Sequence, residues 1–405
     1  MRWPPETFLQ WKFERLAARG VRVTVASTVP RRKAAARVAG AELHRVPHPH
    51  EPRPLKLMGV IWQSLMLSRL SPRRLATLVA AVRRPSPSAL TKTPWPRTIG
   101  LLRAYLGLAR LRPDVVHFEW ERAAVRYLPL LAVWDCPVVV SCRGNVNAYS
   151  RSPQHERWAK GLPRAYENAA AVHCVCEALG NEASPYGLDR RKAWLIRAAL
   201  DPEFFRPASY RRSEGWPMRV ISVGRLIWMK GYEYGLQAIR LLVDREVPVE
   251  LEIVGDGEDR PRIVATIRDL ALDREVRLRG RLTSQEVRDR LQRADVLLQS
   301  SVTEGIPHTM LEAMACGLPV VAAGCGGIPE AVSDRREGLV VPPRDPTAIA
   351  DALEALWRDP GLRTRLGEGG RARVLSDFTL NRQTQDFLAL YEHVTTVVGA
   401  SADGR

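Results

Sequence analysis

The segment from Asp295 to Ala323 constrains the fold of this chain more than any other stretch. It opens with an apolar run that predicts a strand and continues through a polar loop. Apolar residues at helical spacing follow, before a second apolar run at 319–323. Gly317 and Pro319 predict the end of the intervening helix. A strand, a helix and a second strand in this order are typical of a parallel sheet covered by helices.

Two acidic residues flank the start of the predicted helix. Glu304 lies in the loop, and Glu312, separated from it by seven residues, lies on the helix, while Pro307 suits the first helical turn. The free N–H groups of a helix N-terminus favour a phosphate, and carboxylates accept hydrogen bonds from hydroxyls. The segment therefore predicts a site for a phosphate attached to sugar groups. The spacing of the two acids alone would be more typical of a solvated surface helix.

Strand and helix patterns alternate in both halves of the 405-residue chain. The strand-like runs are at 21–27, 115–118, 137–141, 171–176, 218–223, 249–254, 276–278, 296–300 and 319–323. This alternation predicts an α/β fold with two Rossmann-like, doubly wound parallel sheets, which bind ligands at the carboxyl ends of their strands. We expect one domain over residues 1–205, a second over 206–375, and a helix over 376–405 that crosses back to the first domain.

Positive charge is concentrated in the first half. Residues 1–200 hold 33 Lys and Arg against 13 Asp and Glu, a balance of +20, whereas residues 201–405 hold 28 against 31, a balance of −3. The asymmetry predicts an anionic partner for the first half, such as a lipid head group or a lipid diphosphate. A high arginine content from a GC-rich genome would also explain it. Nucleic acid is not expected, because no binding motif with interleaved aromatic residues accompanies the charge.

Residues 55–84 combine apolar and basic side chains. They fit either an interfacial amphipathic helix or core helices with a cationic face. No apolar run approaches the roughly 18 residues of a membrane span, and the N-terminus lacks the apolar core of a signal peptide. Six cysteines without a paired CxxC set predict buried free thiols in a reducing compartment. We therefore expect a cytoplasmic protein, either free or peripheral on the inner face of the cell membrane.

A second motif follows the first strand of the second half, in the stretch Val223-Gly-Arg-Leu-Ile-Trp-Met-Lys-Gly231. Gly224 lets the chain turn after the strand. Arg225 offers a planar fork of donors and Lys230 a mobile point charge, so that the two can converge on one anion. This combination suits a diphosphate.

Together these segments resemble the donor-binding signature of the family-4 retaining glycosyltransferases, which have the GT-B fold. The matching pieces are G-R-x-x-x-x-K-G at 224–231, E-G-x-P at 304–307, E-A-M-A-x-G-x-P-V-V at 312–321 and G-G-x-P-E at 326–330. The resemblance is close over residues 219–332 and loose over the rest of the chain. It implies a site for a nucleotide-sugar donor in the second half.

The resemblance also implies roles for single residues of the second half. Arg225 and Lys230, with Gly224, hold the nucleotide diphosphate, and Glu304 contacts hydroxyls of the transferred sugar. The remaining donor-binding residues are Gly305 and Ile306 at the sugar or distal phosphate, Glu312 at the ribose hydroxyls and Arg281 near the base. Of these, Glu304, Arg225 and Lys230 are expected to be catalytic.

The first half departs from the family pattern. Val115-Val-His-Phe-Glu-Trp120 resembles an H-x-H segment in which Glu119 stands where the family has its second histidine. We expect His117 to be catalytic, and Glu119 and Arg143 to lie on the acceptor or phosphate side. The family's first strand and glycine-rich turn precede a segment like residues 4–8, so we expect either a misplaced start or a missing first strand.

The resemblance implies a retaining, hexosyltransferase-type enzyme of polysaccharide biosynthesis. It would move a sugar from a nucleotide-diphosphate sugar to a cell-surface glycan or a lipid-linked acceptor. The chain holds no DxD triplet of the kind that metal-dependent sugar transferases use, so neither a metal nor another cofactor is expected. Two alternatives stay open: a non-catalytic nucleotide-sugar-binding or scaffold protein, and a GT-B-type epimerase or phosphorylase. A nicotinamide dehydrogenase is not favoured, because neither half has GxGxxG after its first strand.

Overall fold

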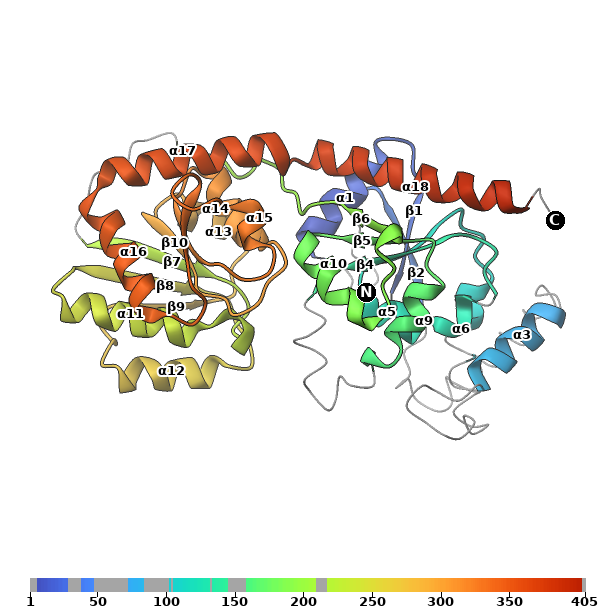
Figure 1. Ribbon diagram of the computed structural model, residues 1–405, viewed down its shortest axis with the longest axis horizontal. Coiled ribbons are helices and arrows are strands. Elements are labelled where there is room, and N and C mark those ends of the chain that lie inside the picture. The colour runs from blue at the N-terminus through green and yellow to red at the C-terminus, as the bar shows by residue number, and fades with distance from the viewer. Residues whose placement is uncertain are drawn as a thin grey trace. The chain divides into compact units, whose positions relative to one another are not determined.

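The computed structural model describes residues 6–27, 38–46, 72–83, 102, 105–131, 133–144, 158–208 and 217–402. Its contacts divide the chain into two compact units (Figure 1). The first unit comprises residues 1–174, 180–195 and 384–405, and the second comprises residues 175–179 and 196–383. Each contains a parallel sheet with helices packed on it, which confirms the predicted α/β class. The domain boundaries expected from the sequence remain predictions.

The first unit is built on four parallel strands in the order β3-β4-β5-β6. They are β3 (Val116–Phe118), β4 (Val138–Cys142), β5 (Ala171–Cys174) and β6 (Ala193–Leu195). Two further strands, β1 (Val23–Ser27) and β2 (Ala41–Arg45), pair in parallel with each other. Within the described residues, no strand pairing joins these two to the four-stranded sheet. The short strands β2 and β6 were not among the runs predicted from the sequence.

The helices of the first unit are short apart from three. They are α1 (Thr7–Ala17), α3 (Pro72–Arg83), α5 (Glu121–Arg126), α6 (Leu128–Leu131), α9 (Leu162–Glu167), the part of α10 (Glu177–Ala183) from residue 180 onward and the part of α18 (Leu380–Ala402) that follows residue 383. Helix α3 buries Leu78 and Val82 in a cluster with Tyr105 and Leu130. For this part of the basic and apolar segment, the structure therefore favours a core helix over an interfacial one. The rest of that segment lies outside the described residues.

The second unit contains six parallel strands in the order β12-β11-β10-β7-β8-β9. They are β7 (Met218–Val223), β8 (Val249–Val254), β9 (Val276–Gly280), β10 (Val296–Gln299), β11 (Val320–Ala323) and β12 (Gly338–Val341). The chain runs outward in one direction from β7 to β9 and then returns to β10 on the other side of β7. In open parallel sheets, ligands bind beyond the carboxyl ends of the strands at such a reversal. The topology therefore predicts a ligand site at the loops that follow β7 and β10.

Seven helices of the described residues belong wholly to this unit. They are α11 (Tyr232–Asp244), α12 (Arg260–Asp269), α13 (Ser284–Leu291), α14 (His308–Ala315), α15 (Ile328–Ala331), α16 (Pro346–Arg358) and α17 (Pro360–Asp377). Leu236 and Ile239 of α11 are both fully buried in the core of the unit. Pro307 precedes α14 instead of standing in its first turn, which corrects the predicted helix start by one residue. Within the described residues, every helix is too short or too polar to cross a bilayer.

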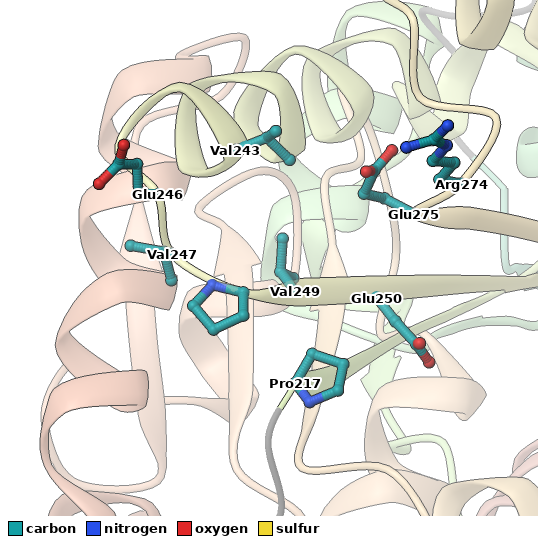
Figure 2. A pocket seen from close by; sticks show the side chains of 9 residues that line it. Pro217, Val243, Glu246, Val247, Val249, Glu250, Arg274 and Glu275 are labelled. Atoms are coloured by element: carbon teal, nitrogen blue, oxygen red, sulfur yellow. The ribbon is translucent and has the colours of Figure 1, made fainter.

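A hollow of about 330 Å³ opens at the amino ends of strands β7, β8 and β9 (Figure 2). Pro217 and Glu275 immediately precede two of these strands, and Glu246, Glu250 and Arg274 add charged groups to its lining. Because the strands are parallel, this hollow lies at the opposite edge of the sheet from the loops that follow β7 and β10. None of the site residues predicted from the sequence lines it.

Candidate functional site

The loop after β7 is held against the ends of two neighbouring strands. The Gly224 amide donates to the Val254 carbonyl at 2.9 Å, and the Val302 amide donates to the Met229 carbonyl at 2.9 Å. Gly231 has φ 59°, and a Cβ at this position would overlap the carbonyl oxygen of Ser300. Close backbone approach is the reason for glycine here. The result is that the 3₁₀ turn Trp228–Lys230 lies beside the end of β10.

Lys230 and Glu304 meet in an ion pair, although they are 74 positions apart in the chain. The ammonium group donates to Oε1 of the carboxylate. The side chains of Lys230 and Glu304 are 17% and 12% exposed, so the pair is enclosed and still reachable from solvent. The structure thus brings together one predicted phosphate-binding cation and the predicted sugar-binding acid.

The glycines of the G-G-I-P-E stretch pack directly on the loop that carries Glu304. Gly326 has φ 53°, and a Cβ there would overlap the carbonyl oxygen of Glu304. The Gly327 amide donates to the Gly305 carbonyl at 3.1 Å. Ile306 is buried next to them. These contacts fix the backbone between β10 and α14, where the predicted donor-binding amides of Gly305 and Ile306 lie.

Glu312 lies on α14, and its carboxyl group is crowded by protein atoms. This burial raises the pKa of Glu312 to about 7. Among the described residues, none donates a hydrogen bond to the carboxyl group. An acid without a partner on the helix that follows the Glu304 loop is suited to accept hydroxyl groups of a ligand, as predicted for the ribose.

Arg225 and Arg281 are the two remaining cations predicted at the donor. Both are exposed, and neither forms an ion pair or side-chain hydrogen bond within the described part of the chain. Arg225 lies two residues after the end of β7. Arg281 follows β9, which is separated from β7 by β8 in the sheet. No contact in the described structure joins Arg281 to Lys230 or Glu304, so its place near the base stays a prediction.

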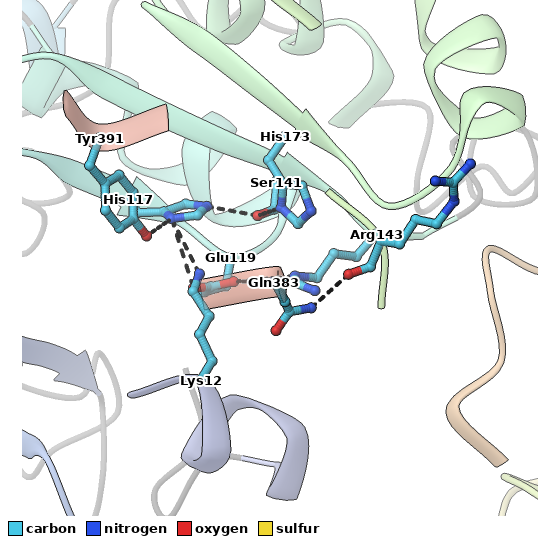
Figure 3. Close-up of polar contacts among 9 residues, drawn as sticks. Lys12, His117, Glu119, Ser141, Arg143, His173, Gln383 and Tyr391 are labelled. Atoms are coloured by element: carbon cyan, nitrogen blue, oxygen red, sulfur yellow. Dashed lines mark hydrogen bonds and ion pairs between the residues drawn. The ribbon is translucent and has the colours of Figure 1, made fainter. Parts of the chain in front are cut away.

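In the first unit, Glu119 is held between two cations (Figure 3). Lys12 Nζ donates to Oε1 at 2.6 Å, and Arg143 Nη2 donates to Oε2 at 2.8 Å. Burial by itself raises the pKa of Glu119, but the charges of Lys12 and Arg143, together with the hydrogen bond from Lys12, outweigh it and hold this pKa well below its usual range. Burial also lowers the pKa of Lys12 to about 8. The acceptor-side roles predicted for Glu119 and Arg143 gain no support from this closed cluster.

His117 belongs to the same network. Its Nδ1 lies 2.7 Å from the hydroxyl of Tyr391 and 3.4 Å from Lys12 Nζ, and its Nε2 lies 2.8 Å from the hydroxyl of Ser141. A charged ammonium has no lone pair, so Nδ1 accepts and Nε2 carries the proton. Burial, followed by the charge of Lys12, lowers the pKa of His117 to about 3. With both nitrogens engaged, the structure gives the predicted catalytic role of His117 no support.

Several residues of these two sites escaped the sequence reasoning. Lys12 lies in α1, where the sequence analysis named no site residue, and its partner Glu119 is 107 positions away. Gln299 and Ser301, which donate to Glu304 at 3.1 and 2.8 Å, end an apolar strand. For Gln299 and Ser301, the sequence offered one signal, namely a polar residue that interrupts an apolar run at the end of a strand.

Glu330, at the end of the G-G-I-P-E stretch, has a capping role. Its carboxylate accepts from the backbone amides of Glu177 at 3.0 Å and Ala178 at 2.9 Å, within the second unit. A carboxylate at the first amides of a helix satisfies donors that have no partner inside the helix. The geometry therefore makes Glu330 a cap of α10.

Comparison with known proteins covers both parts of the chain. Residues 210–373 match the family of glycosyl transferases group 1, and residues 64–204 match Glycosyltransferase Family 4. A glycogen synthase of Mycobacterium tuberculosis is 28% identical over 302 residues, which cover 70% of this chain and 72% of that protein. The amylovoran biosynthesis glycosyltransferase AmsK of Erwinia amylovora is 29% identical over 270 residues, covering 65% of this chain and 66% of AmsK.

Solved structures share the fold at lower sequence identity. Sucrose-phosphate synthase from Thermosynechococcus elongatus has a TM-score of 0.76 at 20% identity, covering 96% of this chain and 93% of that one. HepE from Anabaena, solved in complex with UDP-glucose, has a TM-score of 0.69 at 17% identity, covering 96% of both chains. The two matched segments and the relatives in sequence make this chain similar to glycosyltransferases in both halves, and the solved structures show that it has their two-domain GT-B fold.

Proposed function

We propose that this protein is a retaining glycosyltransferase that takes a hexosyl group from a nucleotide-diphosphate sugar and needs no metal ion. The observation that carries the proposal is the Lys230–Glu304 ion pair at the carboxyl ends of β7 and β10. It joins a cation suited to a diphosphate with an acid suited to sugar hydroxyls, at the place where the sheet topology favours a ligand. HepE, which shares the fold, was solved with UDP-glucose, and this supports a donor of the same class.

Each donor-binding residue has a task in this proposal. Arg225 and Lys230 bind the diphosphate beside Gly224, and the amides of Gly305 and Ile306 face the distal phosphate or the sugar. Glu304 accepts hydroxyls of the transferred sugar, and Glu312 accepts those of the ribose. Arg225 is exposed and, within the described residues, without a partner, so it can turn toward a bound phosphate without breaking an existing contact.

The reaction is proposed to proceed on one face of the sugar. The bond between the anomeric carbon and the diphosphate oxygen breaks, and the acceptor oxygen bonds to the same carbon from the same side. The acceptor proton passes to the departing phosphate oxygen. Negative charge grows on the leaving diphosphate, and Lys230 and Arg225 stabilise it in place of a metal ion. We therefore expect full activity in the presence of EDTA.

The acceptor is proposed to be a growing cell-surface glycan or a lipid-linked saccharide. AmsK carries amylovoran biosynthesis in its name, which supports an acceptor of the polysaccharide class. The balance of +20 over residues 1–200 would favour an anionic acceptor or the anionic inner face of the cell membrane. Peripheral attachment of a cytoplasmic enzyme follows from that charge.

The experiment that tests the proposal is a screen of nucleotide sugars. Purified protein is incubated with UDP-glucose, UDP-N-acetylglucosamine or GDP-mannose, and release of nucleoside diphosphate is measured together with the shift in Tm. Loss of turnover in Lys230→Ala and in Glu304→Ala supports the site, provided that both variants still fold and unfold cooperatively. Arg240→Ala, which removes an exposed ion pair with Asp244 on α11, is the matched control and should keep the wild-type rate.

Three outcomes would speak against the proposal. Unchanged rates in Lys230→Ala and Glu304→Ala would refute the site. A strict need for added manganese would contradict the metal-independent reaction. A rise in Tm with a nucleotide sugar but no release of nucleoside diphosphate with any saccharide acceptor would favour a binding or scaffold protein.

A further inference from the structure

We propose that Gln299 and Ser301 are positioning residues that hold the Glu304 carboxylate so that only Oε2 faces the sugar of the donor. The inference rests on the proposed function, because it assigns the geometry of the same site. It concerns two side chains that the sequence did not mark as functional. Gln299 is the last residue of β10, and Ser301 lies two residues after it.

All protein donors converge on one oxygen of Glu304. Oε1 accepts from Lys230 Nζ, from Ser301 Oγ at 2.8 Å and from Gln299 Nε2 at 3.1 Å. Within the described residues, Oε2 has no hydrogen-bond partner. A carboxylate has about four lone-pair sites over its two oxygens, so the capacity that remains is concentrated on Oε2. Of the two carboxylate oxygens of Glu304, Oε2 is therefore the one that can accept hydrogen bonds from a ligand.

The directions of the hydrogen bonds are determined by the chemistry of the groups. A carboxylate only accepts, so the Ser301 hydroxyl donates its proton to Glu304 and accepts from Gln299 Nε2 at 2.6 Å. The Gln299 amide must then point its NH₂ group at Glu304, since the opposite orientation would set a carbonyl oxygen against a carboxylate. Its Oε1 faces the hydroxyl of Thr309 at 3.4 Å, which is consistent with that orientation.

Burial makes this arrangement rigid. Gln299 and Ser301 are 3% and 0% exposed, so water cannot replace either donor. The thiol of Cys325 donates to the Ser301 carbonyl at 3.3 Å and ties the backbone to the adjacent loop. Buried donors to a charged acceptor are expensive to leave unpaired, and the network therefore favours one rotamer of Glu304.

The hydrogen-bond donors to Glu304 respond differently when a nucleotide sugar binds. Lys230 is on a flexible stem, and its ammonium group can leave Oε1 for the diphosphate. Gln299 and Ser301 cannot leave, so they keep the orientation and the charge of Glu304 after the ion pair opens. Oε2 then accepts hydroxyls of the transferred sugar. A nucleoside diphosphate without a sugar makes no use of Oε2, and this difference makes the inference testable.

The test compares two ligands on one variant. Calorimetric titration first selects the nucleotide sugar that wild-type protein binds best among UDP-glucose, UDP-N-acetylglucosamine and GDP-mannose. Kd is then measured for that compound and for UDP or GDP, whichever is its nucleoside diphosphate. In Ser301→Ala, we expect affinity for the nucleotide sugar to fall about tenfold, because a hydrogen bond to a charged group is lost. Affinity for the nucleoside diphosphate should change less than about twofold, because that ligand does not reach Glu304.

Further variants separate positioning from general damage. Gln299→Leu removes the amide donors and should show the same selective loss. Ser222→Ala removes another buried serine hydroxyl, on β7 of the same sheet, and should alter neither Kd. In a Glu304→Ala background, Ser301→Ala should have no further effect on either ligand, because a residue that acts through Glu304 has nothing left to position. A merely structural role would persist in that background.

The outcomes distinguish the inference from the function on which it rests. If wild-type protein binds none of the nucleotide sugars and neither UDP nor GDP, the proposed function fails, and the inference fails with it. If the donor binds and Ser301→Ala leaves both Kd values unchanged, or lowers both affinities equally, only the inference is overturned. The same holds if the loss persists undiminished in the Glu304→Ala background.

Discussion

Two acidic side chains at the carboxyl ends of parallel strands, Glu119 after β3 and Glu304 after β10, meet cations in very different ways. Both oxygens of Glu119 are occupied, one by Lys12 and the other by Arg143. All three side chains of that cluster are at most 8% exposed. Glu304 is 12% exposed and uses Oε1 alone. Both acids form ion pairs, so an ion pair does not identify the ligand site. Glu304 differs because one of its oxygens can still accept a hydrogen bond and the side chain is reachable from solvent.

The largest effect on stability is expected from the substitution of Glu119. Glu119→Ala leaves the ammonium of Lys12 and the guanidinium of Arg143 buried without a counter-charge, which should destabilise the first unit by about 3–5 kcal/mol. The free energy of unfolding from urea titrations measures the effect. A loss below about 1 kcal/mol would mean that solvent reaches the cluster and that Glu119 resembles Glu304 after all.

Glu304→Ala should lower turnover strongly and the stability of the protein less than Glu119→Ala does. Its ion pair with Lys230 is partly exposed, but the buried donors Gln299 and Ser301 lose their acceptor, so the free energy of unfolding should fall by about 1–3 kcal/mol, less than in Glu119→Ala. Turnover of the nucleotide sugar should fall by about 10²–10³-fold or more, because a group that binds at the reacting centre is lost. Steady-state rates and urea titrations on one preparation would check both parts. Large instability with retained turnover would reverse the assignments of the two clusters.

The pH dependence of stability should single out His117. Burial and Lys12 depress the pKa of its ring from 6.5 to about 3, so the folded protein resists a proton that the unfolded chain accepts. The resulting stability is complete above pH 6.5 and is lost as pH falls toward 3, by about 1.4 kcal/mol per pH unit. His117→Gln should remove that slope relative to wild type. Parallel stability curves for the two proteins between pH 6.5 and 4.5 would contradict the neutral, buried histidine.

The second unit should respond to pH with the opposite sign. Burial raises the pKa of Glu312 from 4.5 to about 7, so the folded protein holds a proton that the unfolded chain releases. Its contribution to stability therefore declines as pH rises from 4.5 to 7. Ligand affinity should move the other way, because hydroxyl groups of a ribose donate best to the ionised carboxylate. We expect affinity for the nucleotide sugar to rise by up to about tenfold between pH 6 and 8.

Glu312→Gln is the variant that isolates this effect. It should flatten the rise in affinity, while Glu304→Gln should leave the rise in place. Calorimetric Kd values at three pH values would measure both. If the affinity of Glu312→Gln still rises with pH as in wild type, a group other than Glu312 is responsible for the rise.

The sequence allowed much of the second unit to be predicted, because its signals are local. Apolar runs mark β7, β8 and β10, and glycine and proline bracket α14. The meeting of Lys230 with Glu304 followed from a resemblance, and no local pattern could have shown it. The cluster around Lys12 was missed for a physical reason. Its members come from α1, β3, β4 and α18, and long-range burial of a charge leaves no mark on helical periodicity.

A structure of the complex with a nucleotide sugar would test the central claim most directly. We predict the pyrophosphate against Lys230 and Arg225, with Lys230 Nζ released from Glu304 and with Oε2 of Glu304 at a sugar hydroxyl. A complex in which the Lys230–Glu304 ion pair stays closed and the nucleotide sugar binds elsewhere would contradict the account.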